Sequence, residues 1–208
     1  MVAGAEMQVA VGGTPDFGMI SDWGQELQEA MRAAGWGDER GEVLIWKTGY
    51  STVPMNPEGI NTDLGIDFSG YSGAGFSLTP DDMSWQEDPI LWAESYRSQI
   101  DRTLVHFASM LPEDGGTWPA VTEFGAWAAP CGFWNAENAE HCESFWSEDH
   151  IVEAYAQVLD AVRVYNESND QDYRAVFPMD APWDSNQFAL HYSERVQEAI
   201  REGLANLD

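Results

Sequence analysis

The chain has 208 residues, a length that suits a single domain with its own hydrophobic core. Its content of 44% hydrophobic and 12% aromatic residues excludes an intrinsically disordered chain. The 36 acidic residues against 9 basic ones give a formal net charge of −27, a field that repels phosphate backbones and anionic membranes, so neither is an expected partner.

Apolar segments with strand and helix periodicity alternate along the chain. They predict strands at residues 6–12, 42–48, 66–71, 119–124 and 173–180. They predict helices at residues 22–35, 90–110, 148–166 and 193–207. Because strands that alternate with helices form parallel sheets, we expect an α/β fold with about five parallel strands and flanking helices.

The first of these helices has the clearest start signal. Asp22 is followed by Gln25, the pattern of an N-cap residue with a capping-box partner. The helix is expected to end near Gly35 or Gly37. One face should then turn the following residues inward: Trp23, Leu27, Ala30, Met31 and Ala34.

Two long segments read as loops. The first follows Tyr71, is rich in Gly, Ser and Asp, and reaches the helix that starts near residue 90. The second is the longest irregular stretch of the chain, at residues 126–147.

The strand at residues 119–124 leaves a carboxylate, Glu123, at its carboxyl end, between aromatic residues and just before Gly125. Parallel α/β sheets and barrels carry their chemistry at that end of the strands. Glu123 is therefore the first candidate catalytic residue.

The run Thr122-Glu123-Phe124-Gly125 after an apolar strand resembles the nucleophile strand of retaining glycoside hydrolases with a (β/α)8 barrel, the clan that includes many β-glycanases. Nearly the whole chain fits the C-terminal half of such a barrel, with the five predicted strands as its fourth to eighth. The resemblance implies that residues 1–208 form one domain. It also implies that a β-linked polysaccharide or glycoside is the substrate, with Glu123 as nucleophile.

The chain departs from the clan at the acid/base position. Clan members carry a Gly-Asn-Glu-Pro type motif after the fourth strand, whereas this chain reads Gly12-Gly13-Thr14-Pro15-Asp16. Thr14 cannot protonate a leaving group, and Asp16 is the nearest carboxyl that could replace it. The same departure favours an alternative: a non-catalytic carbohydrate-binding or degenerate glycosidase-fold protein.

The resemblance assigns further residues to a sugar site. Tyr71 falls where many clan members keep a tyrosine that orients the nucleophile, and Trp183 falls where members stack a tryptophan under the sugar. Flat aromatic faces suit pyranose rings, although such residues also fill cores. The remaining substrate-binding candidates are Trp127, Trp134, Trp146, Lys47 and Asp180.

We expect neither a metal nor a cofactor. The alternative is a calcium site in the acidic segment that contains Glu140, His141, Cys142, Glu143, Glu148, Asp149 and His150. In a chain of this charge, such segments are usually solvated.

A closed barrel needs eight strands, and five are predicted. Either an upstream half is missing, or a half-barrel associates with another chain or with itself, or the chain forms an open α/β layer. A missing upstream half would also explain why Met1 does not open a signal peptide. Cys131 and Cys142 are spaced for a loop-closing disulfide, which predicts an extracellular, secreted protein; two free thiols are the alternative.

The surface charge generates a testable prediction. Lys47 is the only lysine, and an acidic, lysine-poor surface is typical of halophilic proteins. Because molar salt screens most of the self-repulsion, the midpoint of thermal unfolding should rise steeply from low salt to molar salt. Circular dichroism melts over that range measure it, and a flat response would contradict salt adaptation.

Overall fold

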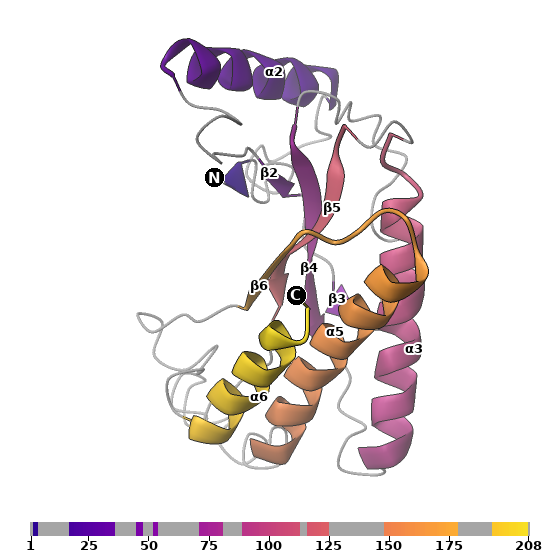
Figure 1. Ribbon diagram of the computed structural model, residues 1–208. Helices are drawn as coiled ribbons and strands as arrows, with labels where there is room; N and C mark the ends of the chain where they lie inside the picture. The colour runs from indigo at the N-terminus through magenta and orange to yellow at the C-terminus, as the bar shows by residue number, and fades with distance from the viewer. Residues whose placement is uncertain are drawn as a thin grey trace, which may run out of the picture.

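The structure is a computed structural model that describes residues 2–3, 17–35, 45–47, 52–53, 71–80, 89–112, 116–124, 148–178 and 193–207. These residues form an α/β fold in which a parallel sheet lies beside a layer of helices (Figure 1). The strands are β1 (Val2–Ala3), β2 (Ile45–Lys47), β3 (Thr52–Val53), β4 (Gly73–Pro80), β5 (Trp118–Phe124) and β6 (Ala175–Pro178). The helices are α2 (Phe17–Ala33), α3 (Pro89–Ala108), α5 (Glu148–Ser168) and α6 (Glu194–Ala205).

The sheet is all parallel, as expected, but its strands differ from the five predicted. Among the described residues, three strands reach four residues or more, and they lie in the order β4, β5, β6. The other strands are two or three residues long: β1 pairs with β2, and both β2 and β3 pair with β4. The strands predicted at residues 119–124 and 173–180 are confirmed as β5 and β6, and β2 lies within the one predicted at 42–48.

Of the strand predicted at residues 66–71, only Tyr71 is among the described residues. Tyr71 lies outside any strand, and β4 begins two residues later, inside the segment that we expected to be a loop. Alternate residues of β4 supply the core: Ala74, Phe76 and Leu78 have no exposed surface. The strand predicted at residues 6–12 lies outside the described residues.

Glycines on β4 allow β5 to approach closely. A Cβ atom at Gly73 would lie 2.6 Å from the Trp118 ring. At Gly75 it would lie 2.5 Å from Thr122 Cγ2 and 2.6 Å from the Ala120 carbonyl oxygen. Side chains of β5 thus occupy the space above these glycines, which explains why a glycine-rich segment forms a central strand.

Three helices, α3, α5 and α6, form one layer, with α5 packed between α3 and α6 (Figure 1). Their predicted ranges are confirmed to within two residues at every end. Helix α6 starts as expected at Ser193, whose Oγ accepts a hydrogen bond from the Val196 N–H at 3.1 Å. Each of these helices buries one face, and the following residues lie in or against the core: Tyr96, Ile100, Leu104, Phe107, Ile151, Tyr155, Val158, Leu159, Val162, Tyr165, Val196, Ile200, Leu204 and Leu207.

Helix α2 differs from its prediction at its start. It begins at Phe17, so Asp22 is an exposed residue within the helix and not its N-cap. Its end is as predicted, because Gly35 has a φ of 81°, a conformation that favours glycine. Leu27 and Met31 pack against the core as expected, whereas Ala30 and Ala34 are exposed.

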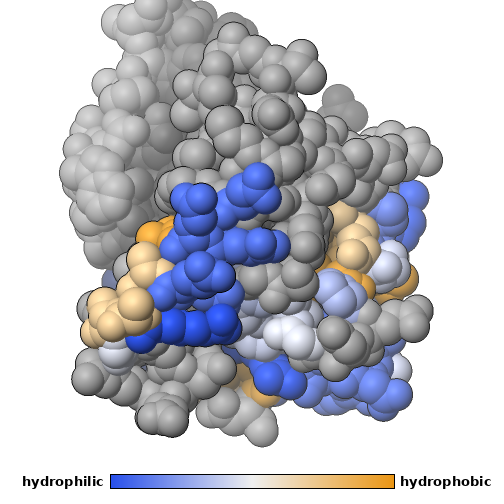
Figure 2. All heavy atoms as spheres, turned by 90° about the horizontal axis from the view of Figure 1, so that it is seen from above, coloured by the Kyte–Doolittle hydropathy of each residue, from blue (hydrophilic) through white to orange (hydrophobic). Residues whose placement is uncertain are grey.

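The inward face of α2 is instead formed around Gly24 and Gln28, both buried. A Cβ atom at Gly24 would lie 1.3 Å from the Tyr71 hydroxyl oxygen, so helix and tyrosine are in direct contact. Figure 2 looks at this side of the molecule, where hydrophilic side chains follow the solvent-facing side of α2. Its exposed charged residues are Asp22, Glu26, Glu29 and Arg32.

Charged side chains join α3 to α5 on the outer side of the helix layer. Arg97 on α3 bonds Asp101 at 2.8 Å and Asp160 on α5 at 2.5 Å. Asp160 also pairs with Arg163, which pairs in turn with Glu167 at 2.6 Å. The hydrogen bonds from Arg163 and then Arg97 hold the pKa of the Asp160 carboxyl below its ordinary value of 3.8.

The lowered pKa of Asp160 predicts a pH-dependent contribution to stability. The contribution is fully present above the unfolded value near pH 4 and is lost as the pH falls through the lower folded value. Asp160→Asn should therefore reduce the free energy of unfolding by about 0.5–1 kcal/mol at pH 7, because the pairs are partly solvated. The difference from the unmodified protein should shrink below about pH 4.

Urea unfolding at one fixed salt concentration measures this difference. The matched control is Glu26→Gln, which removes the same charge at an exposed site of α2 that has no ion pair among the described residues. It corrects for the relief of general repulsion in a chain of charge −27. Equal effects of both substitutions at pH 7 would contradict a stabilising network.

Candidate functional site

The site is centred on Glu123, the penultimate residue of β5, whose side chain is half-buried. Its backbone pairs in register with Ser77 of β4. Because β4, β5 and β6 are parallel, their carboxyl ends meet at one edge of the sheet, and Glu123 lies at that edge as predicted.

A β-bulge lies immediately before Glu123. Phe76 pairs with Val121 and Ser77 with Glu123, so Thr122 is one extra residue relative to β4. On the other side, Val121 pairs with Val176 and Phe124 with Pro178, so Thr122 and Glu123 together lie opposite Phe177 alone. Bulges of this kind re-aim side chains and are frequent next to active sites.

The bulge determines which face of the sheet Glu123 occupies. Val121 belongs to the core, and the Phe124 ring lies 5.4 Å from the Tyr155 ring of α5, so both residues face the helices. Thr122 contacts the opposite side, above Gly75. Since neighbouring residues of a strand alternate, Glu123 also falls on the face away from α5. Two consecutive polar residues therefore share the face of β4, β5 and β6 opposite to α3, α5 and α6, called the helix-free face here because no described helix covers it beside these residues.

Phe177 is a further candidate that the sequence analysis missed. Its neighbour Val176 packs against the core, which leaves Phe177 on the helix-free face beside Thr122 and Glu123. It is 41% exposed, a large fraction for an aromatic residue within a parallel strand. Only the bulge register reveals it, because β6 reads in the sequence as a buried strand.

Tyr71 does not lie beside Glu123, contrary to the role that the resemblance implies. The Thr117 hydroxyl donates to the Tyr71 carbonyl at 2.9 Å, just before β5 begins. Tyr71 is thus at the amino end of the sheet, and Glu123 is about 20 Å further along at the strand rise of roughly 3.3 Å per residue. Burial against α2 raises the pKa of the Tyr71 hydroxyl to about 12.

The physical reason for this error is that Tyr71 precedes a strand and does not end one. The prediction ended a strand at Tyr71, which would place the tyrosine at the carboxyl edge. In the structure Tyr71 precedes β4 instead, so it contacts α2 and cannot orient the Glu123 carboxylate.

The other predicted site residues are described only in part. Lys47 ends β2, and its backbone pairs with Gly75, one strand away from β5. The remaining predicted site residues lie outside the described residues: Thr14, Asp16, Trp127, Trp134, Trp146, Asp180 and Trp183. Cys131 and Cys142 lie there as well, so the predicted disulfide stays a prediction.

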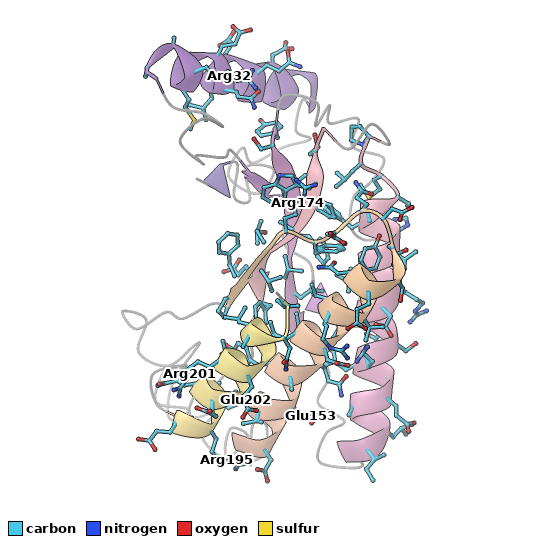
Figure 3. All side chains as sticks on the ribbon, in the orientation of Figure 1. Arg32, Glu153, Arg174, Arg195, Arg201 and Glu202 are labelled. Atoms are coloured by element: carbon cyan, nitrogen blue, oxygen red, sulfur yellow. The ribbon has the colours of Figure 1, made fainter. Side chains whose placement is uncertain are left out.

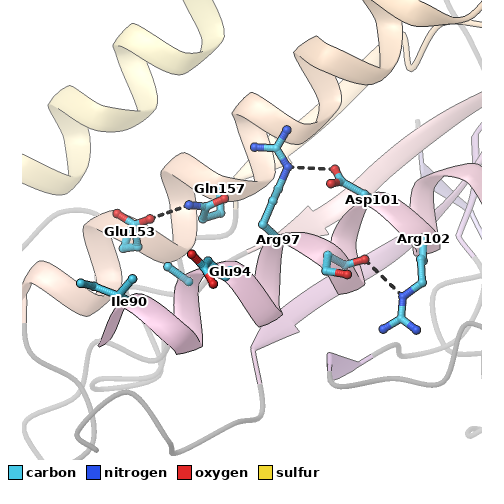
Figure 4. A pocket seen from close by; sticks show the side chains of 9 residues that line it. Ile90, Glu94, Arg97, Asp101, Arg102, Glu153 and Gln157 are labelled. Atoms are coloured by element: carbon cyan, nitrogen blue, oxygen red, sulfur yellow. Dashed lines mark hydrogen bonds and ion pairs between the residues drawn. The ribbon is translucent and has the colours of Figure 1, made fainter. Parts of the chain in front are cut away.

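An open groove of about 800 Å³ lies between α3 and α5 (Figure 4). Its cations are engaged: Arg97 binds Asp101 and Asp160, and Arg102 Nε donates to the Ser98 carbonyl at 3.3 Å. Every residue that lines it lies on α3 or α5, and none of them lies on a strand. The groove therefore belongs to the ion-paired joint between the helices and not to the edge that carries Glu123.

Within the described ranges, no three His, Cys, Asp or Glu side chains are grouped as metal ligands. Most of the acidic segment considered for calcium lies outside those ranges. The described helices also lack any segment with the length and hydropathy needed to cross a bilayer.

Comparisons with known proteins give no assignment. No protein-family model matches the chain, and neither the curated proteins nor the solved structures include a significant match.

Proposed function

We propose that this protein acts on glycosides by a retaining mechanism in which Glu123 is the nucleophile. The observation that supports it most is the position of Glu123, at the carboxyl edge of a parallel sheet and on the face away from the helices. That combination is what an active site inside a (β/α)8 barrel requires.

The order of the strands supports a barrel-like scaffold. β4, β5 and β6 are neighbours in chain order, with α3 and α5 as the connecting helices. Since parallel crossovers are right-handed, successive steps in one direction leave all the helices on one side of the sheet. A closed barrel repeats this step eight times, so the helix-free face corresponds to its interior.

The half-barrel itself remains part of the proposal. An open parallel sheet leaves an edge and a face that another element must cover. An upstream half-barrel, or a second copy of the chain, would supply the missing strands. Size measurements of the purified protein in molar salt distinguish a monomer from an associated form.

In the proposed reaction, an oxygen of the ionised Glu123 carboxylate bonds to the anomeric carbon as the bond to the leaving oxygen breaks. Water then attacks the same carbon, gives up a proton to solvent or to a nearby carboxylate, and releases the Glu123 carboxylate. A second carboxyl normally protonates the leaving oxygen, and Asp16 is the remaining candidate for that role. Without such an acid, natural glycosides should react about 10²–10⁴-fold more slowly than with one.

The test uses sugars that leave without protonation. The purified protein is incubated in molar salt with 2-deoxy-2-fluoro glycosides of several sugars that carry activated leaving groups, and its intact mass is recorded. We expect a mass increase of one fluorosugar, because such substrates form the covalent intermediate and then hydrolyse slowly. Glu123→Gln should abolish the increase.

Glu153→Gln is the matched control, since it removes a carboxylate from α5 on the far side of the helix layer (Figure 3). It should label as the unmodified protein does. Labelling that persists in Glu123→Gln, or no labelling of folded protein by any sugar, would contradict a nucleophilic Glu123.

The second candidate is a carbohydrate-binding protein without catalysis. Thr14 favours it, because the acid/base position of the clan lacks a carboxyl in this chain. Oligosaccharide binding by a folded protein that forms no adduct would support it. Secretion and halophilic adaptation fit either candidate and stay predictions.

A further inference from the structure

We propose that Phe177 contacts the ligand directly and forms an apolar platform for a neutral pyranose ring held beside Glu123. This inference rests on the proposed function and adds to it a residue and a substrate class. The ligand is a neutral oligosaccharide, as opposed to a uronate or sulfated one.

The Phe177 ring belongs to the residue of β6 that lies opposite Glu123. Val121 pairs with Val176 and Phe124 with Pro178, so Phe177 is the single residue of β6 opposite Thr122 and Glu123. Paired residues on neighbouring strands lie about 4.8 Å apart, a distance that one pyranose ring can span. A pyranose over Phe177 would therefore be next to the Glu123 carboxylate.

The Phe177 side chain is exposed, unlike the other described phenylalanines of the sheet. The other described phenylalanines of the sheet, Phe76 and Phe124, are fully buried, and each contacts an aromatic ring of the helix layer. Phe177 faces the other way and keeps 41% of its surface exposed. An aromatic face exposed at the carboxyl edge of a parallel sheet is suited to the apolar C–H face of a pyranose.

The described arginines lie away from Glu123 and Phe177. The described arginines on helices lie on α2, α3, α5 and α6, and Figure 3 shows Arg195 and Arg201 on α6, away from the sheet. Arg174 precedes β6, and its N–H donates to the Pro119 carbonyl, four residues before Glu123. The described ends of β5 and β6 thus combine a carboxylate with an aromatic ring and include no basic residue, while Lys47 ends β2, on the other side of β4 from β5.

An anionic sugar would be repelled at this edge. It would face Glu123 within a molecule of formal charge −27, and neither β5 nor β6 carries a basic residue to pair with it. A neutral sugar loses nothing to this field. The same charge that excludes nucleic acids as partners therefore also selects among glycans.

The experiment measures binding and chemistry separately, with the full chain in molar salt. Binding is measured by calorimetry in Glu123→Gln, which prevents turnover, with neutral cello-, xylo- and manno-oligosaccharides and with oligogalacturonate as the anionic probe. We expect binding of at least one neutral probe and none of oligogalacturonate. Adding Phe177→Ala should weaken the neutral affinity about tenfold, and Phe177→Trp should retain it.

Two further variants separate ligand contact from structure. Phe177→Leu keeps an apolar side chain but has no ring face, so it should bind as weakly as Phe177→Ala. Its thermal unfolding midpoint should stay near that of the protein with Phe177 unchanged. Val105→Ala truncates an exposed apolar residue of α3, 57% exposed, and should leave binding unchanged.

The outcomes for Phe177 and for Glu123 are distinct. Equal affinity of the Ala, Leu and unmodified forms, preference for oligogalacturonate, or no binding of any neutral probe would overturn the inference. Loss of fluorosugar labelling with Phe177-dependent binding intact would overturn only the nucleophile. Glu123-dependent labelling that Phe177→Ala leaves unchanged would overturn only the platform.

Discussion

The rest of the structure depends on the close pairing of β4 with β5. Gly73 and Gly75 leave room for Trp118 and Thr122 of the neighbouring strand. A larger residue at either glycine would displace those side chains and separate the two strands. On the other face, Phe76 of β4 lies 4.7 Å from Phe107 of α3, which fixes the helix layer to the same strand. Burying such a ring contributes about 1.5–3 kcal/mol.

The candidate site follows from one irregularity in this pairing. The extra residue in β5 allows Val121 and Phe124 both to face the helices, although three positions separate them. The polar pair Thr122 and Glu123 is then left together on the other face. In a regular strand the faces alternate strictly. With Val121 toward the helices, Glu123 would then face the helices as well, and Phe124 would face away from them. The bulge thus connects core packing with the position of the carboxylate.

The sequence predicts the helices and the strand of Glu123 well. Helices α3 and α5 have long apolar stripes that only a helix with one buried face satisfies, and β5 is a continuous apolar run before a glycine. Strand β4 escaped prediction because Gly73 and Gly75 are rare inside strands and common in loops, and only the contacts with β5 explain them. The misplaced Tyr71 is a consequence of that error.

Other features depended on tertiary structure alone. Asp22 is a residue type that often caps helices, but α2 starts five residues earlier, at Phe17. Gly24, which follows Asp22 closely, packs against Tyr71 inside that longer helix. Phe177 in an apolar strand has no sequence signal that distinguishes an exposed ring from a buried one. Its orientation follows only from the register between β5 and β6. Local patterns give the elements, whereas the faces and neighbours of the site residues come from strand pairing.

The central claim is that Glu123 and Phe177 share the helix-free face at the carboxyl edge of the sheet. A crystal structure of the chain grown from molar salt tests it most directly. We expect the Thr122 bulge, the Glu123 carboxylate beside the Phe177 ring, and α3, α5 and α6 together on the opposite face. A Glu123 side chain turned toward Tyr155, or helices on both faces of β4, β5 and β6, would contradict it.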